Sequence, residues 1–242
     1  MIRLSHTPDF QKPALLCVAG NLCDPSVAFE RITPPGDFQK LYVHYFDSPG
    51  PWDMETLGQE LAHLLQQFTS APVVLAGYSA GGVLCISAAS KNPERISGLV
   101  LSNTGPCSKG HGSPQFAQEL KEHFDDENYI RRFLSSCFYQ PIPKEVEDRL
   151  WNYTRTIPPE AGYEVSLSLR QMDYRESLKA YKGPAAVIHG QLDTRRKMDS
   201  VEMICDSLPQ AQVTLLQTGH TPMWEDAAGY EKALETLLKR IN

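Results

Sequence analysis

One stretch of the sequence, residues 73–82, constrains the fold more strongly than any other, because an apolar run leads directly into a serine between glycines. Residues 73–76 predict a buried strand, and the small apolar residues at 83–90 predict a helix. Between them, Gly77-Tyr78-Ser79-Ala80-Gly81 matches a tight turn that holds a serine hydroxyl out above a sheet edge. The flanking positions must be small, since a Cβ there would strike the neighbouring strand or helix. We therefore predict that Ser79 is a nucleophile; the alternative is a simple helix N-cap.

The rest of the chain repeats a strand-then-helix order around this stretch. Further strands are expected at 14–19, 41–46, 96–101, 184–190 and 212–216, and helices at 54–68, 197–208 and 224–241. Short continuous apolar strands of this kind are typical of a parallel sheet buried on both faces. We predict an α/β fold with a mostly parallel central sheet of about six strands flanked by helices. The loops after the strands should gather at one sheet edge, where such folds bind ligands.

The alternation stops between residues 108 and 182. Apolar residues recur there at helical spacing in short groups separated by prolines, which predicts several short helices without a strand between them. We predict a helical cap inserted over residues 108–182, and a core domain formed by residues 1–107 and 183–242. The alternative is that these helices simply pack on a face of the sheet.

Composition and charge exclude several classes of protein. The formal net charge of -6 argues against a nucleic-acid-binding protein, which needs a basic face for the phosphates. The sequence contains no stretch of about eighteen apolar residues, so we expect no membrane span. The first residues lack the apolar run of a secretory signal. The six cysteines are scattered without a C-x-x-C pair, so we expect a reduced cytoplasmic protein with no metal site. We expect a monomer or homodimer.

Two later residues supply what a nucleophilic serine needs. A serine hydroxyl requires a neighbouring base, and histidine can take and return a proton near neutral pH. The imidazole in turn needs a carboxylate that fixes its tautomer. Asp193 follows the strand that ends at Gly190, and His220 follows the last strand, so both should lie at the same sheet edge as Ser79. Asp199 is the alternative acid.

These three motifs resemble those of the α/β-hydrolase superfamily. The matching segments are Gly77-Tyr78-Ser79-Ala80-Gly81-Gly82, Gly190-Gln191-Leu192-Asp193 and Gly219-His220, in the family's order. The resemblance extends from about residue 14 to residue 241. It implies a serine hydrolase with a Ser79–His220–Asp193 triad and no metal or organic cofactor. The sequence departs from the family in its amino-terminal strand pair, which we expect to be mostly absent because only about thirteen residues precede the first strand.

The resemblance also implies an oxyanion hole made of two backbone N–H groups. The first is that of Ala80, directly after the nucleophile. The second comes from the loop after the first strand and maps to Asn21, with Leu22 as the alternative. The family usually carries a histidine where this chain has Ala19, so the bracing of this loop differs.

Other residues are candidates for lining the substrate pocket. They are Leu22, Cys23, Tyr78, Asn103, Thr104 and Trp224, with His111 as a further candidate contact near the cap. His189 lies within a predicted strand and is expected to be a core histidine, and His44 is expected to be a strand residue.

The predicted function is hydrolysis of a small to medium ester, thioester or lactone through an acyl-enzyme. The partner is then a small-molecule carbonyl compound held under the cap. Three alternatives stay open. The triad could serve only proton transfer in a C–C bond hydrolase or lyase, the chain could have a haloperoxidase-like activity, or it could be a non-catalytic ligand-binding protein on a hydrolase scaffold.

Overall fold

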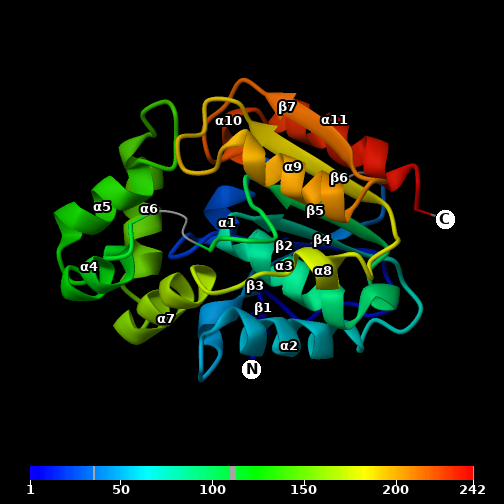
Figure 1. Ribbon diagram of the computed structural model, residues 1–242, viewed down its shortest axis with the longest axis horizontal. Coiled ribbons are helices and arrows are strands. Elements are labelled where there is room, and N and C mark those ends of the chain that lie inside the picture. The colour runs from blue at the N-terminus through cyan, green and yellow to red at the C-terminus, as the bar shows by residue number, and fades with distance from the viewer. Residues whose placement is uncertain (35, 110–112, 242) are drawn as a thin grey trace.

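The computed structural model describes residues 1–34, 36–109 and 113–241, and its elements follow the predicted alternation (Figure 1). The strands are β1 (Arg3–Leu4), β2 (Ala14–Val18), β3 (Gln39–His44), β4 (Val73–Tyr78), β5 (Gly98–Ser102), β6 (Ala185–Gly190) and β7 (Gln212–Leu216). The helices outside the segment between β5 and β6 are α1 (Pro25–Ala28), α2 (Met54–Leu65), α3 (Ala80–Lys91), α9 (Met198–Ser207), α10 (Pro222–Glu225) and α11 (Ala227–Leu238). Between β5 and β6 lie α4 (Phe116–Glu122), α5 (Glu127–Ser135), α6 (Lys144–Thr154), α7 (Pro159–Leu169) and α8 (Arg175–Leu178). Single 3-10 turns occur at Tyr45–Asp47 and Pro93–Arg95.

The strands form one sheet in the order β1-β3-β2-β4-β5-β6-β7. All neighbouring pairs from β3 to β7 are parallel, which confirms the mostly parallel sheet. The additional strand, β1, pairs antiparallel with β3 over two residues, with Arg3 opposite His44. Two residues give no readable period, so the sequence did not reveal this edge strand.

Helices cover both faces of the sheet (Figure 1). On one face α3 packs on β4 and β5, with α2 and α8 against α3 and α9 beside α8. On the other face α11 packs on β5, β6 and β7, and α1 packs on β3. The central strands β2, β4 and β5 are buried at every residue, as their continuous apolar sequences predict. None of the described helices combines the length and the apolar character that a bilayer span requires.

All the named elements between β5 and β6 are helices, α4 to α8. Helices α4 to α7 lie beyond one edge of the sheet, where α4 packs on α7 and α5 packs on α6 (Figure 1). The short helix α8 instead packs on α3 and α9. The division into a core domain and a cap over residues 108–182 stays a prediction.

Several element boundaries differ from the sequence prediction. Tyr45 and Phe46 leave the sheet in a 3-10 turn and do not extend β3, and β5 begins at Gly98, two residues later than expected. The predicted final helix is two helices, because the backbone of Asp226 leaves the helical conformation (φ -137°, ψ 73°) and its carboxylate caps α11 by accepting from the Gly229 N–H at 2.9 Å. Such a cap depends on a local hydrogen bond, which the spacing of apolar residues in the sequence does not predict.

At Gly81, helix α3 comes close to the backbone at the end of β2. A Cβ added to Gly81 would lie 2.2 Å from the carbonyl oxygen of Val18 and 2.3 Å from that of Ala19. Gly77, at the end of β4, would bring a Cβ within 2.6 Å of the Gly82 Cα. The glycines on both sides of Ser79 are therefore required by close approach of the chain.

We predict that Gly81→Ala lowers the free energy of unfolding by about 2–4 kcal/mol, because the added methyl group forces α3 away from β2. Urea unfolding followed by circular dichroism measures the change. Gly105→Ala is the matched control, since a Cβ there comes no closer than 3.2 Å to any atom. Equal stability of the two variants would contradict the prediction.

Candidate active site

Ser79 occupies a strained turn between β4 and α3. Its backbone has φ 54° and ψ -120°, a positive φ that L-residues rarely adopt. Hydrogen bonds on both sides hold it there: its N–H donates to the Ser102 carbonyl at 3.0 Å, and its own carbonyl accepts from the Thr104 hydroxyl at 2.7 Å. The turn leaves the hydroxyl at the first turn of α3, above the sheet edge.

The structure brings the three predicted side chains together. The His220 Nε2 lies 2.9 Å from the Ser79 Oγ, and the His220 Nδ1 lies 2.7 Å from the Asp193 Oδ2. Both distances are those of good hydrogen bonds. The residues come from the ends of β4, β6 and β7, three strands of one parallel sheet, so the loops meet at one edge as the topology predicts. Asp199, the alternative acid, is exposed in the first turn of α9 and accepts from the Ser200 N–H.

Asp193 is held as a carboxylate. Its side chain is inaccessible to solvent, and this burial opposes ionisation. Hydrogen bonds from His220, from the Asn103 amide at 2.5 Å and from the Arg195 N–H at 2.7 Å outweigh burial and lower the pKa of Asp193 to about 2. Because the ionised carboxylate can only accept a hydrogen bond, the proton of neutral His220 lies on Nδ1. The lone pair of Nε2 then faces the Ser79 hydroxyl.

Asn103 therefore contacts the acid rather than the pocket. It adopts a φ of 45° at the end of β5, and its amide oxygen accepts from the Gly190 N–H at 3.1 Å. Its amide nitrogen also reaches the Gly219 carbonyl at 3.4 Å. One side chain thus joins the loops that carry Asp193 and His220. We expected pocket lining at this position; the structure gives it a positioning contact.

Burial has the opposite effect on His220. Desolvation of the imidazolium lowers the pKa of His220 below its usual 6.5, although the Asp193 carboxylate favours the charged form. The Tyr78 ring packs edge-on against the imidazole with centroids 5.1 Å apart. The Tyr78 hydroxyl lies 3.3 Å from the Thr221 hydroxyl. His220 is therefore neutral at pH 7 and fixed in orientation by an aromatic neighbour.

Glu225 organises the loop that carries His220. Its carboxylate accepts from the backbone N–H groups of Gly219 at 3.1 Å, Thr221 at 3.3 Å and Tyr139 at 3.1 Å. Tyr139 follows α5, so this carboxylate also ties the loop to the segment above it. Burial raises the pKa of Glu225, and the nearby Asp193 charge acts in the same direction. Sequence reasoning missed this residue, because a glutamate in a short helix gives no signal.

Two backbone N–H groups are candidates for an oxyanion hole. Among the described residues, neither the Asn21 N–H nor the Ala80 N–H has a hydrogen-bond acceptor. The Asn21 side chain is anchored on α7, where its amide donates to the Ser166 hydroxyl at 2.8 Å. Leu22 follows at a φ of 60°, and the Cys23 N–H closes the turn on the Gly20 carbonyl at 3.2 Å. Contacts to α7 and a tight turn thus brace this loop where the family usually has a histidine.

A small cavity of about 40 Å³ adjoins Ser79. Its lining residues are Gly20, Asn21, Cys23, Tyr78, Ser79, Phe133, Leu134, Cys137, Phe138, Leu150, Arg195 and His220. The predicted candidates Cys23 and Tyr78 are present, but the apolar residues of α5, α6 and the loop between them, and Arg195, were not foreseen. Apolar positions at helical spacing look the same in sequence whether they line a cavity or fill a core.

The other candidates lie elsewhere. The Trp224 indole is behind the Phe138 ring and donates to Glu30 at 3.1 Å, and Leu22 is fully buried outside the lining. His189 is buried within β6, as expected, and His44 ends β3. His111 lies outside the described residues.

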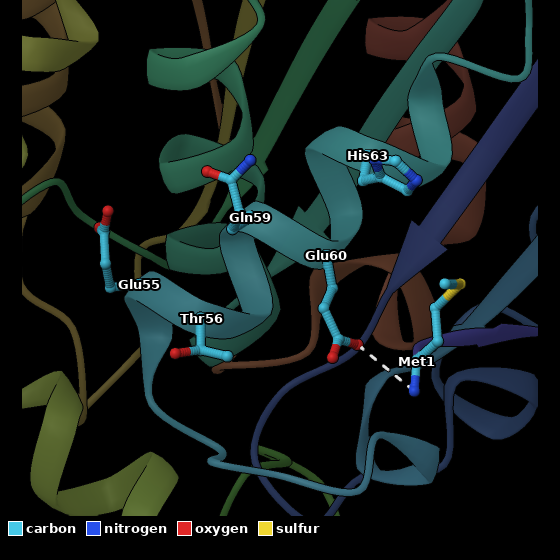
Figure 2. A pocket seen from close by; sticks show the side chains of 6 residues that line it. All are labelled: Met1, Glu55, Thr56, Gln59, Glu60 and His63. Atoms are coloured by element: carbon cyan, nitrogen blue, oxygen red, sulfur yellow. Dashed lines mark ion pairs between the residues drawn. The ribbon is translucent and has the colours of Figure 1, made fainter.

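A larger hollow, of about 500 Å³, lies on the exposed side of α2 (Figure 2). Figure 2 shows Met1, Glu55, Thr56, Gln59, Glu60 and His63 around it, with the Met1 amino group 3.8 Å from Glu60. Thr56 carries the one hydroxyl of this lining and donates to Asp53 rather than to a histidine. We place the candidate active site at Ser79 because, within the part of the chain that the structure describes, only there do a hydroxyl, an imidazole and a carboxylate form one hydrogen-bonded chain. Among the described residues, no three His, Cys, Asp or Glu side chains are grouped as a metal site requires.

Comparisons with known proteins agree with the fold. A family model described as the alpha/beta hydrolase fold matches residues 44–227, more than half of the chain. A pimeloyl-[acyl-carrier protein] methyl ester esterase of Yersinia enterocolitica is 26% identical over 231 residues, covering 88% of this chain and 87% of that enzyme. A 3-oxoadipate enol-lactonase of Acinetobacter baylyi is 22% identical over 197 residues, covering 80% and 73%. The crystal structure of bromoperoxidase from Bacillus anthracis superposes with a TM-score of 0.79 at 18% identity, covering 98% and 94%.

The chain therefore belongs to the α/β-hydrolase family. It is an enzyme of the hydrolase class, and the relatives described above include an esterase and a lactonase.

We predict that Glu225→Ala lowers the free energy of unfolding by about 2 kcal/mol, because three backbone N–H groups lose their acceptor. Urea unfolding at pH 7 measures this change. Glu235→Ala, an exposed position of α11, should change stability by no more than about 0.5 kcal/mol. If Glu225→Ala were as mild as this control, the bracing assigned to the carboxylate would be wrong.

Proposed function

We propose that the chain hydrolyses a small carboxylic ester, thioester or lactone, with Ser79 as nucleophile, His220 as base and Asp193 as acid partner. The observation that carries the proposal is the continuous hydrogen-bonded chain from Ser79 Oγ through His220 to Asp193. The substrate is a small-molecule carbonyl compound. The names of the relatives, a methyl ester esterase and an enol-lactonase, support ester and lactone substrates.

In the first half-reaction the Ser79 Oγ attacks the carbonyl carbon while His220 Nε2 takes the hydroxyl proton. The negative charge that forms on the carbonyl oxygen is stabilised by the N–H groups of Ala80 and Asn21. Each donor of this kind contributes about 3 kcal/mol to transition-state stabilisation. The protonated His220 then gives its proton to the leaving oxygen or sulfur, and the acyl group stays on Ser79.

In the second half-reaction water attacks the acyl-enzyme while His220 again accepts the proton. The collapse of this intermediate releases the carboxylic acid and returns the proton to Ser79. Asp193 remains ionised throughout, because its pKa of about 2 lies far below neutral pH. Its charge stabilises the imidazolium that forms in each half-reaction and fixes the tautomer between them.

The cavity limits the size of the group that binds without rearrangement. A space of about 40 Å³ holds a few water molecules, whereas pockets for drug-sized ligands span roughly 300–1,000 Å³. The acyl group that fits is therefore short, and the side chains of Phe133, Phe138 and Leu150 must move to admit more. The predicted cap thus selects the substrate.

We also place the enzyme in the cytoplasm. The six cysteines are all unpaired, which suits a reducing compartment.

We predict that a fluorophosphonate probe labels the wild-type protein and fails to label Ser79→Ala, because only an activated serine hydroxyl attacks phosphorus at a useful rate. Intact-protein mass spectrometry measures the adduct. Ser90→Ala, on the same helix, should be labelled like wild type. Absence of labelling on wild type would favour a ligand-binding protein, and labelling without turnover of any ester would favour the C–C hydrolase, lyase or haloperoxidase alternatives.

We predict that kcat/KM on a short-chain nitrophenyl ester falls as the pH decreases through a single ionisation below 6.5. Burial lowers the pKa of His220, and only neutral His220 can accept the serine proton, so activity is full above this pKa and lost below it. Initial rates at subsaturating ester between about pH 4 and 8 give the profile. An inflection above the value of free histidine would show that the base is another group or that His220 is charged at rest.

A further inference from the structure

Arg195 is a charged side chain in the lining of the Ser79 cavity. It lies two residues after Asp193, in the loop that follows β6. The described lining otherwise holds apolar, sulfur and neutral polar groups and His220, which is neutral at pH 7. A guanidinium keeps its charge at any pH at which a protein works. The cavity next to the nucleophile therefore carries a permanent positive charge.

Contacts on two sides fix the position of this side chain. The guanidinium carbon lies 4.9 Å from the centre of the Phe133 ring, and Nη2 donates to the Phe133 carbonyl at 3.3 Å. Nη2 also donates to the Ser136 hydroxyl. At the other end, the Arg195 N–H donates to Asp193. The charge is thus oriented before any substrate arrives, which reduces the entropy lost on binding.

The surroundings make this charge selective. The side chains of Phe133, Leu134, Phe138 and Leu150 give the cavity an apolar wall, in which a charge interacts more strongly than it does in water. An alkyl group gains nothing from a guanidinium. A carboxylate accepts charge-assisted hydrogen bonds from it, in two parallel bonds where the geometry allows.

We propose that Arg195 binds a free carboxylate of the substrate, so that the ester or lactone cleaved at Ser79 carries a second, ionised carboxyl group. This inference rests on the proposed hydrolase function. Arg195 is then the specificity residue of the site, and the substrates are short monoesters of dicarboxylic acids or acylated hydroxy acids. The two differ in whether the carboxylate lies on the acyl or the alcohol side of the scissile bond.

Two matched pairs of esters test the proposal in the whole protein. Monomethyl succinate and methyl 4-methylpentanoate differ by an isopropyl group in place of the carboxylate on the acyl side. The 3-acetoxypropionate anion and neutral 3-methylbutyl acetate form the second pair, in which an isopropyl group replaces a carboxylate on the alcohol side. We expect kcat/KM to favour the acidic member of at least one pair by about 10- to 100-fold, the range typical of a hydrogen bond to a charged group.

For the variants we measure the ratio of kcat/KM between the acidic and the neutral ester of that pair, because a general loss of activity leaves this ratio unchanged. Arg195→Gln should bring the ratio to about one, and Arg195→Lys should keep part of the preference because the charge remains. Arg132→Gln is the matched control: it removes an exposed guanidinium of α5 that lies outside the cavity lining, so the wild-type ratio should persist.

Three results would overturn the proposal. One is a wild-type ratio of kcat/KM, acidic over neutral ester, near or below one in both pairs. This result does not depend on the folding of any variant. Another is an equal loss on both members of a pair in Arg195→Gln, and the third is a ratio that Arg132→Gln changes as much as Arg195→Gln does. Failure of the hydrolase function itself looks different, since no ester of either pair would then be turned over and no fluorophosphonate adduct would form on Ser79.

Discussion

The close approach of α3 to the end of β2 is the contact on which the site depends. It is possible only because Gly81 has no side chain between the helix and the carbonyl oxygens of β2. The turn that results forces Ser79 to a positive φ, and the carbonyl of Ser102 on β5 accepts its N–H. The position of the hydroxyl is therefore set by the register of three buried strands. A site placed on such rigid elements keeps its geometry better than one placed on free loops.

Two carboxylates, those of Asp193 and Glu225, hold the loops that complete this site, and their pKa values are shifted in opposite directions. Asp193 accepts from a histidine, an amide and a backbone N–H, and these contacts keep its pKa low against the cost of burial. Glu225 accepts only backbone N–H groups and lies near the Asp193 charge, so burial prevails and its pKa rises. The first carboxylate bonds to the His220 imidazole itself, and the second holds the backbone of the loop that carries His220.

The wall of the cavity opposite the sheet comes from a different part of the chain. Residues of α5 and α6 approach Ser79 from above, and contacts such as Tyr139 to Glu225 and Arg195 to Phe133 join them to the loops of the sheet. The loops of the sheet thus carry the hydrogen-bonded chain from Ser79 through His220 to Asp193, while α5, α6 and the loop between them line the cavity beside it. This division explains why relatives with one fold carry names with different substrates.

The sequence by itself determined the parallel sheet and the meeting of Ser79, His220 and Asp193 at one edge of it, because each rests on a local pattern: a buried apolar run, a glycine-bounded turn, or a polar residue in the loop after a strand. Only the tertiary structure decided that Asn103 supports the acid, that Trp224 lies behind Phe138, and that Arg195 faces the cavity. Those roles depend on contacts between residues far apart in the chain. A hydrophobic period reports which face of a helix is buried but not which group it is buried against.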